Sequence, residues 1–99
     1  MRPFLIAGIA SIVLSTGVLA EDDPDFALLP DGTAQEDVFY MCSACHSVKL
    51  VAQQRLSRKR WDETLDWMVE EGGMAELDAE EREPILDYLE THFGEETPR

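Results

Sequence analysis

The stretch MCSACHSVKL, residues 41–50, contains two cysteines two residues apart and a histidine directly after the second cysteine. Cysteines and a histidine in this order fit three kinds of site: a redox-active disulfide, half of a zinc site, and the attachment site of a c-type haem. Each kind of site requires different partners elsewhere in the chain. The rest of the sequence therefore has to decide between them.

Two of these alternatives lack partners in this sequence. A thioredoxin-like disulfide lies at a turn from a strand into a helix, and no alternating apolar pattern of strand length follows residue 20. A zinc site takes four ligands, and besides Cys42 and Cys45 only His46 and His92 remain. His46 directly follows Cys45 and would have to bend back toward the same ion. The sequence therefore favours haem over zinc or a disulfide.

Covalent haem attachment uses all three residues of the motif. Two thiols bond to the two vinyl groups of the porphyrin, and the side chain after the second thiol reaches the iron from one face. The run CSACH supplies these groups in the required order. We therefore predict one haem c, bonded covalently to Cys42 and Cys45, with His46 as an iron ligand.

The N-terminal residues have the pattern of a secretory signal peptide. Arg2 precedes an apolar run over residues 4–14, and Val18-Leu19-Ala20 stands immediately before an acidic stretch. We interpret residues 1–20 as a cleaved signal, which predicts a periplasmic protein with no membrane segment after cleavage. An uncleaved anchor is the alternative, but the interrupted apolar run is shorter than the roughly 20 residues that span a bilayer. Export suits haem attachment, which takes place outside the bacterial inner membrane.

The chain that remains after cleavage is short and strongly acidic. Seven basic residues stand against 21 acidic ones, which leaves a formal net charge of −14. Such a chain repels nucleic acid and anionic lipid, so neither is an expected partner. A domain of this size usually needs a disulfide, a metal or a cofactor to hold its thin core. Covalent haem would meet that need.

Residues 21–32 and the segment after them predict an arm followed by a helix. Pro24 and Pro30 predict that residues 21–32 form an extended N-terminal arm, and we expect residues 33–99 to form the folded domain. Thr33 and Glu36 have the spacing of a capping box. We therefore predict a helix that begins there and runs into the cysteines.

A second helix is predicted from Ser57 onward. Trp61, Leu65 and Met68 recur at intervals of four and three residues and so share one face of a helix. Gly72-Gly73 is expected to end the helix. This face is a candidate surface for packing, with Trp61 placed to pack on the haem.

A third helix is predicted after Asp78, which forms a second capping box with Glu81. Pro84 inside this segment removes one backbone hydrogen bond, so we expect the helix to begin near Glu83 or to have an irregular first turn. The apolar residues of this segment form a broad face: Ile85, Leu86, Leu89 and Phe93.

The motif and the helices together resemble the class I monohaem cytochrome c family. The resemblance covers most of residues 33–93: a CxxCH motif near the end of the first helix, a methionine loop, and a last helix containing Asp87-Tyr88-Leu89. It implies a small all-α cytochrome c fold, in which the three predicted helices pack around one covalent haem. Members often use a proline carbonyl to orient the iron-bound imidazole, but no proline lies between His46 and Pro84. We therefore expect a carbonyl within residues 48–55 to accept the imidazole N–H.

Several side chains compete for the second axial position on the iron. Met74 follows Gly72-Gly73, where the chain can turn tightly, and it is the ligand we expect. Met68 suits a core position, His92 suits bis-histidine ligation or a helix-capping role, and Met41 is poorly placed beside an attachment cysteine. An open site is the remaining alternative. Methionine ligation would raise the reduction potential relative to histidine, which suits an electron acceptor.

Most of the basic residues gather just after the motif. Five of the seven lie within residues 49–60: Lys49, Arg55, Arg58, Lys59 and Arg60. They form either a solvated surface or contacts with haem propionates or an acidic partner. Arg55 is our candidate for the propionate contact. Trp67, six residues after Trp61, is expected to be partly exposed.

The run from Leu50 to Leu77 resembles the small cytochrome subunits of bacterial sulfite dehydrogenases. The resemblance implies a heterodimer in which a molybdenum-cofactor subunit oxidises sulfite and this chain, with no catalytic residue of its own, relays single electrons to a cytochrome c or an oxidase. A free carrier between another periplasmic dehydrogenase and a terminal oxidase is one alternative. A gas-binding or peroxidatic haem protein with an open iron site is another.

Overall fold

The computed structural model describes residues 22–99, and the predicted signal peptide lies outside the described residues. Within 22–99 the chain is all-α, as predicted, with no strand. The elements are the short 3-10 helix η2 (Pro24–Leu28) and the helices α1 (Gln35–Ser43), α2 (Lys49–Ala52), α3 (Arg58–Glu70) and α4 (Ala79–Phe93). No helix among these residues combines the length and the apolar character needed to cross a bilayer.

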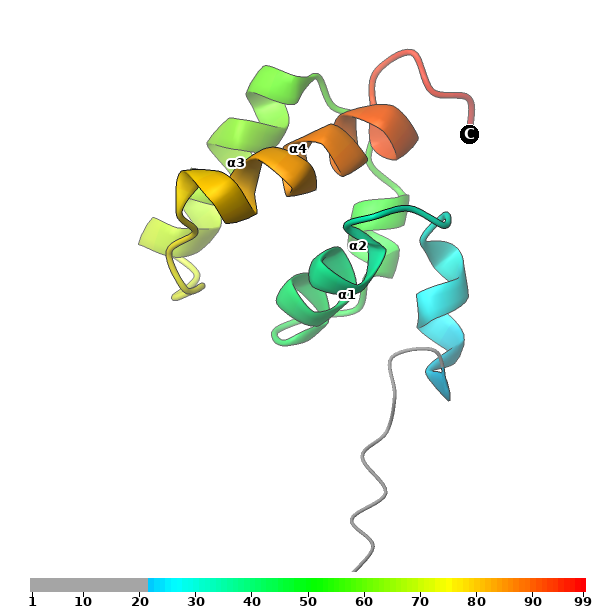
Figure 1. Cartoon of the computed structure of the whole chain (residues 1–99), viewed down its shortest axis with the longest axis horizontal. Coiled ribbons are helices and arrows are strands. Elements are labelled where there is room, and N and C mark those ends of the chain that lie inside the picture. The colour runs from blue at the N-terminus through cyan, green and yellow to red at the C-terminus, as the bar shows by residue number, and fades with distance from the viewer. Residues whose placement is uncertain (1–21) are drawn as a thin grey trace, which may run out of the picture.

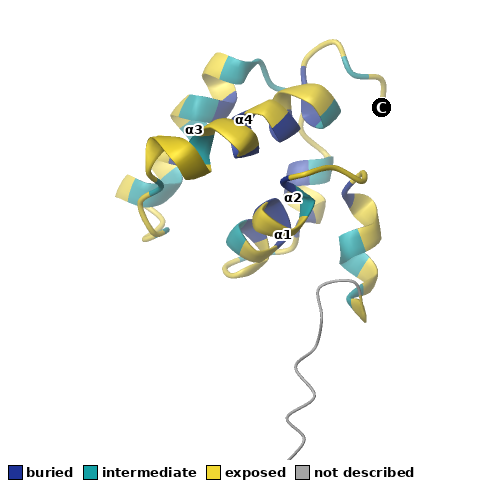
Figure 2. Ribbon diagram, viewed as in Figure 1, coloured by how far each residue is buried: buried dark blue, intermediate teal, exposed yellow. Residues whose placement is uncertain are grey.

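The helices meet around one core (Figure 1). α3 and α4 pack against each other, α1 also packs on α4, and α2 contacts η2. Figure 2 shows that the buried positions lie on the sides of the helices that face one another. The core takes side chains from every α-helix and from the segment before α1, with these the most completely buried: Leu29, Val38, Val48, Leu65 and Leu89.

α3 forms as the sequence predicts. Ser57 is its N-cap and accepts a hydrogen bond from the backbone N–H of Arg60 at 3.2 Å. The stripe of the amphipathic helix is buried at Trp61 and Leu65. Gly73 adopts φ +72°, a left-handed conformation that glycine reaches without a steric penalty, just after the helix ends.

α4 begins at the predicted capping residue. Asp78 caps it by accepting from the N–H of Glu81 at 2.9 Å, and the helix runs from Ala79 without a break through Pro84. The alternative start near Glu83 is therefore wrong. Pro84 removes one hydrogen bond on an exposed side of the helix, while the residues after it bury a broad apolar face, so burial outweighs the missing bond.

The N-terminal arm is not extended. Pro24–Leu28 winds into η2 instead. Leu29 is only 2% exposed, and the Phe26 ring lies edge-on to Phe39 of α1 with 5.3 Å between the ring centroids. Docking on α1 removes apolar side chains of the arm from water, and this burial stabilises the docked arm relative to an extended one.

The predicted capping box at Thr33 does not form. α1 begins at Gln35, and its N-cap Ala34 has no side chain able to accept a hydrogen bond. The docked arm sets the start of the helix instead, because the Gln35 side-chain amide donates to the Leu29 carbonyl at 2.9 Å. A hydrogen bond to the docked arm, six residues back in the chain, stands in place of the predicted cap.

Two arginines link α3 to α4. Arg58 at the start of α3 contacts three carboxylates spaced along α4, at 2.7–2.9 Å: Glu83, Asp87 and Glu90. Arg82 of α4 contacts Asp62 and Asp66 of α3 at 2.8 and 2.7 Å. The hydrogen bonds that Arg58 donates to Glu90 and Asp87 raise the pKa of its guanidinium further above the usual range. Single exposed ion pairs stabilise little, but these two networks fix the register of the helix pair.

Tyr88 joins α4 to the arm. Its hydroxyl donates to the carbonyl of Pro30, and its side chain is buried. Burial, helped by the negative charge of Asp31, raises the pKa of Tyr88 to about 12. The phenol therefore stays protonated in the folded chain at a pH where the unfolded chain ionises.

Replacing Tyr88 with phenylalanine is expected to lower the free energy of unfolding by about 1 kcal/mol at neutral pH, because one hydrogen bond is lost. In the wild type the Tyr88 contribution is complete below about pH 10 and declines as the pH rises toward about 12. Urea unfolding at pH 8 and pH 11 measures how far the free energy of unfolding falls over this pH range. The fall should be smaller in Tyr88→Phe and unchanged in Tyr40→Phe, and equal falls in the two variants would contradict the raised pKa of Tyr88.

Candidate functional site

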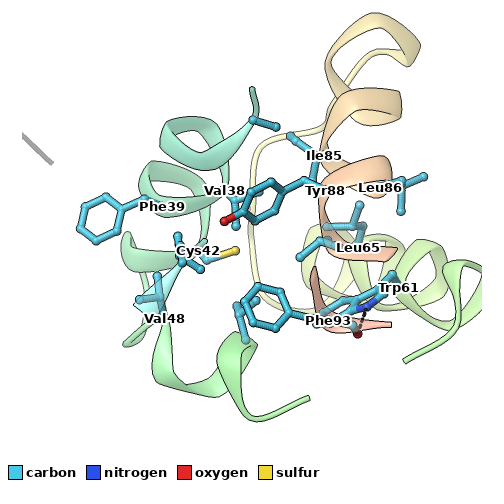
Figure 3. Close-up of a cluster of buried hydrophobic side chains, with 14 residues drawn as sticks. Val38, Phe39, Cys42, Val48, Trp61, Leu65, Ile85, Leu86, Tyr88 and Phe93 are labelled. Carbon is cyan, nitrogen blue, oxygen red and sulfur yellow. Dashed lines mark hydrogen bonds between the residues drawn. The ribbon is translucent and has the colours of Figure 1, made fainter. Parts of the chain in front are cut away.

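The CxxCH motif lies at the junction of α1 and α2. Cys42 is in the last turn of α1, Cys45 follows the helix, and His46 lies in the turn that leads to α2. Both cysteines are free thiols, with Cys42 buried and Cys45 exposed. In Figure 3 the Cys42 sulfur points into the cluster formed by Leu65, Tyr88 and Phe93.

The thiol environment is unlike that of a redox-active disulfide. Such sites lower a cysteine pKa with a helix N-terminus or a neighbouring cation. Cys42 instead sits at the C-terminal end of α1, and burial raises the pKa of its thiol to about 11. With no strand in residues 22–99 to form a strand-to-helix turn, the thioredoxin-like alternative has no support in the fold.

Nor do the side chains converge as a zinc site requires. Within residues 22–99 no group of three or more histidine, cysteine, aspartate or glutamate side chains is close enough to hold one ion. The His92 ring packs against Tyr88 at a tilt of 53°, with 4.6 Å between the ring centroids, and lines a separate cavity with Gly32. His92 therefore does not line the cavity that contains His46.

Two cavities flank the motif. One, of about 370 Å³, is the Cys42 cavity, and its lining includes Cys42, His46, Leu50, Trp61, Leu65 and Met68. The other, of about 640 Å³, is the Cys45 cavity, and its lining includes Tyr40, Met41, Cys45, Met74, Leu77 and Ile85. Both volumes fall within the roughly 300–1,000 Å³ typical of ligand sites.

Large apolar side chains remain exposed around these cavities. Leu50 is 51% exposed and Trp67 62% exposed, and both line the Cys42 cavity. Tyr40 is 53% exposed and lines the Cys45 cavity. A cluster of exposed apolar surface marks a binding site, and a large flat apolar group lying along the motif would cover these side chains.

The residues present fit a covalent haem. The two thiols of the motif each open onto a largely apolar cavity, an imidazole lines one of these cavities, and a methionine thioether is available in each. This donor set matches haem c, which takes two cysteine thioethers, a histidine and in many cases a methionine. Cys42, Cys45 and His46 would hold the group, and Trp61 would form part of its apolar wall.

The two candidate methionines lie in different cavities. Met68, on the inner face of α3, lines the cavity that also contains His46. Met74, the ligand expected from the sequence, lines the other cavity together with Met41 and Cys45. Its backbone N–H is held at 3.0 Å from the Met68 carbonyl, which turns the chain back over the end of α3. The shared cavity favours Met68 as the partner of His46.

Arg55 is occupied elsewhere. Its guanidinium donates to the carbonyls of Thr97 and Pro98 at 3.1 and 3.2 Å and lies 5.5 Å from the centre of the Phe93 ring. It lines neither cavity. Arg55 thus holds the C-terminal residues in this structure, and its contact with a haem propionate stays a prediction. Elsewhere in the basic cluster, Arg58 binds α4, and Lys59 and Arg60 form exposed ion pairs with Glu63.

His46 finds its hydrogen-bond partner outside the expected range. Its Nδ1 lies 3.0 Å from the Ser47 carbonyl oxygen, not from a carbonyl within residues 48–55. The carbonyls of Val48, Lys49 and Val51 accept backbone N–H groups in and just after α2, a helix that the sequence analysis did not predict, and the Ser47 carbonyl also accepts from the Leu50 N–H at 3.2 Å. A carbonyl only accepts, so Nδ1 donates this hydrogen bond, and in the neutral imidazole Nε2 then keeps the lone pair that a metal requires.

The cavity residues of α2 were missed by the sequence analysis. The Cys42 cavity is lined by Leu50 and Val51 of α2 and by Gln54, the second residue after that helix. A helix of four residues is too short to show a periodic apolar pattern. The one signal in the sequence that could have indicated this helix was the apolar run Leu50-Val51-Ala52, shortly after the motif.

The two thiols are expected to react at different rates with an alkylating reagent. In protein produced without haem, at pH 8, Cys45 should react first and Cys42 about tenfold or more slowly, since only the thiolate attacks and Cys42 is buried with a raised pKa. Mass spectrometry of tryptic peptides over time measures both rates. In the presence of urea the two rates should converge, and equal rates under native conditions would contradict the burial of Cys42.

Comparisons with protein-family models, with curated proteins and with solved structures found no match to this chain.

Proposed function

We propose that this chain is a periplasmic c-type cytochrome that accepts and relays single electrons. The observation that carries the proposal is the Cys42 cavity, where an attachment thiol, the motif imidazole and a methionine thioether meet in apolar surroundings. The second thiol, Cys45, opens onto the Cys45 cavity. The resemblance to monohaem cytochromes c rests on the same CxxCH motif, together with the methionine loop and Asp87-Tyr88-Leu89 of the last helix.

Each residue has a defined task in this proposal. The Cys42 and Cys45 thiols would hold the haem through two thioether bonds, each made by adding the S–H across a vinyl group. His46 would offer its Nε2 lone pair to the iron, and Met68 would offer its thioether sulfur. Bound haem supplies the one-electron couple of its iron. Trp61 and Leu65 keep water from the pocket, which favours stable electron storage over reaction with solvent.

Electron transfer is favoured over gas binding by the position of Met68. An open-site haem protein leaves one axial position free for a small ligand. Here a flexible thioether lies in the same cavity as the histidine, where it can close that position. The chain itself then performs no bond chemistry on a substrate.

A molybdenum-cofactor dehydrogenase subunit is the electron donor we propose, with sulfite as its substrate. Support comes from the resemblance of residues 50–77 to small sulfite dehydrogenase subunits. This run supplies most of the lining of the Cys42 cavity, including Leu50, Trp61 and Met68. A downstream cytochrome c or an oxidase would then receive the electrons.

The direct test is periplasmic expression with the bacterial haem-attachment machinery. We expect a red protein whose haem stays bound in denaturant, with a mass increased by one haem. Cys42→Ala/Cys45→Ala should carry no covalent haem. A colourless wild-type protein would overturn the proposal and would return thiol chemistry to consideration.

The partner is tested separately. The chain should co-purify with a molybdoprotein from its native source, and sulfite should reduce its haem only when that protein is present. Reduction by another dehydrogenase, with no stable complex, would instead support a free carrier.

A further inference from the structure

A hydrogen-bonded link connects the N-terminal segment to the motif histidine. The Ser47 hydroxyl donates to a carboxylate oxygen of Asp25 in η2 at 2.9 Å, across 22 residues of sequence. The carbonyl of the same serine accepts from His46 Nδ1 at 3.0 Å. Ser47 thus contacts the histidine through its backbone and the arm through its side chain.

Both ends of this link are held in place. The N–H of Asp25 donates to Asp23, the N-cap of η2, at 2.8 Å, and η2 is docked on the core beside Leu29. On the other side the N–H of Lys49 donates to the Ser47 hydroxyl at 3.2 Å, which ties the serine to the start of α2. η2 and α2 are also in direct contact. Ser47 is therefore positioned by two elements at once.

The orientation of a ligating imidazole depends on the acceptor bonded to its second nitrogen. This bond fixes the ring and makes the ligand more basic, and such outer contacts tune a metal site substantially. In this chain the acceptor is the Ser47 carbonyl, which also accepts from the Leu50 N–H at 3.2 Å, while the Asp25 carboxylate binds the side chain of the same residue.

We propose that Asp25 is a positioning residue for the iron-binding imidazole of His46, acting through Ser47. The inference rests on the proposed function, because it assigns His46 to the iron. The N-terminal arm then does more than fill the core: its carboxylate sets the hydrogen bond that makes His46 a stronger donor to oxidised iron. A more basic imidazole lowers the reduction potential.

The test uses the haem-loaded protein and measures the reduction potential of five variants. Asp25→Ala and Ser47→Ala should raise it, by a change of up to about tenfold in the redox equilibrium constant, or about 59 mV for one electron. Asp22→Ala is the matched control, since it removes the same charge from the same segment and should cause a smaller rise. Asp25→Asn, which keeps an acceptor, should follow that control, and Ser47→Thr, which keeps the hydroxyl, should stay near the wild type.

A spectroscopic readout separates positioning from simple folding. The Nδ1 proton of His46, observed by NMR in the reduced protein, should exchange with water faster in Asp25→Ala than in Asp22→Ala. Equal potentials and equal exchange rates in these two variants would overturn the inference while leaving the cytochrome proposal intact. A wild-type protein without covalent haem would instead overturn the proposed function.

Discussion

Replacing Met68 with alanine is expected to abolish the weak long-wavelength band of a methionine–iron(III) bond and to let the reduced protein bind carbon monoxide at neutral pH. Met68 lines the cavity that contains His46, so its loss opens the axial position opposite the histidine. The reduction potential should fall as well, because a thioether ligand raises it. Absorption spectra of the oxidised, reduced and carbon monoxide-treated protein show the band and the carbon monoxide binding, and spectra recorded during a redox titration give the reduction potential.

Two variants control for packing and for the second candidate. Met68→Leu keeps the side-chain volume and removes the sulfur, so it should lose the band with a stability close to that of the wild type, whereas Met68→Ala should also cost about 2 kcal/mol of unfolding free energy. Met74→Ala should keep the band. Loss of the band in Met74→Ala alone would assign the ligand to the Cys45 cavity and restore the expectation drawn from the sequence.

Replacing Trp61 with alanine is expected to lower the free energy of unfolding by about 3–5 kcal/mol. Trp61 is 3% exposed, and its indole N–H donates to the Phe93 carbonyl at the end of α4 at 3.0 Å. Substitution removes this hydrogen bond and opens a void between α3 and α4 beside the Cys42 cavity. Domains have only about 5–15 kcal/mol of stability in total, so the variant should be close to unfolding.

The same helix offers the control for this prediction. Trp67 is 62% exposed, so Trp67→Ala should cost about 1 kcal/mol or less. Trp61→Phe keeps most of the packing and should lose chiefly the hydrogen bond, about 1 kcal/mol. Urea unfolding of the haem-loaded proteins measures each value. Similar losses for the two alanine variants would show that Trp61 is not the central contact of the helix pair.

Local signals in the sequence identified the two long helices. Ser57 and Asp78 cap them because each side chain accepts from an N–H three residues along, an interaction that needs no distant partner. The end of α3 is also local, because Gly73, just after the helix, adopts a positive φ that glycine reaches without steric cost. Helical spacing also separated the buried Trp61 from the exposed Trp67, since the direction of a side chain follows from its position on the helix.

Packing contacts account for the predictions that were wrong. Thr33 has the spacing of a cap, but α1 starts at Gln35, whose side chain binds Leu29 of the docked arm. Pro84 left a late start for α4 open, but the helix begins at the Asp78 cap and stays continuous through Pro84, where the residues that follow are buried.

The sequence by itself determined which reactive side chains are available, because the order of Cys42, Cys45 and His46 along the chain does not depend on folding. Only the tertiary structure decided which groups meet. It brought Met68 and not Met74 to the cavity of the histidine, turned Arg55 toward the C-terminal residues, and joined Asp25 to Ser47. These outcomes depend on how helices pack across many residues of chain, and that packing is a property of the whole core rather than of any motif.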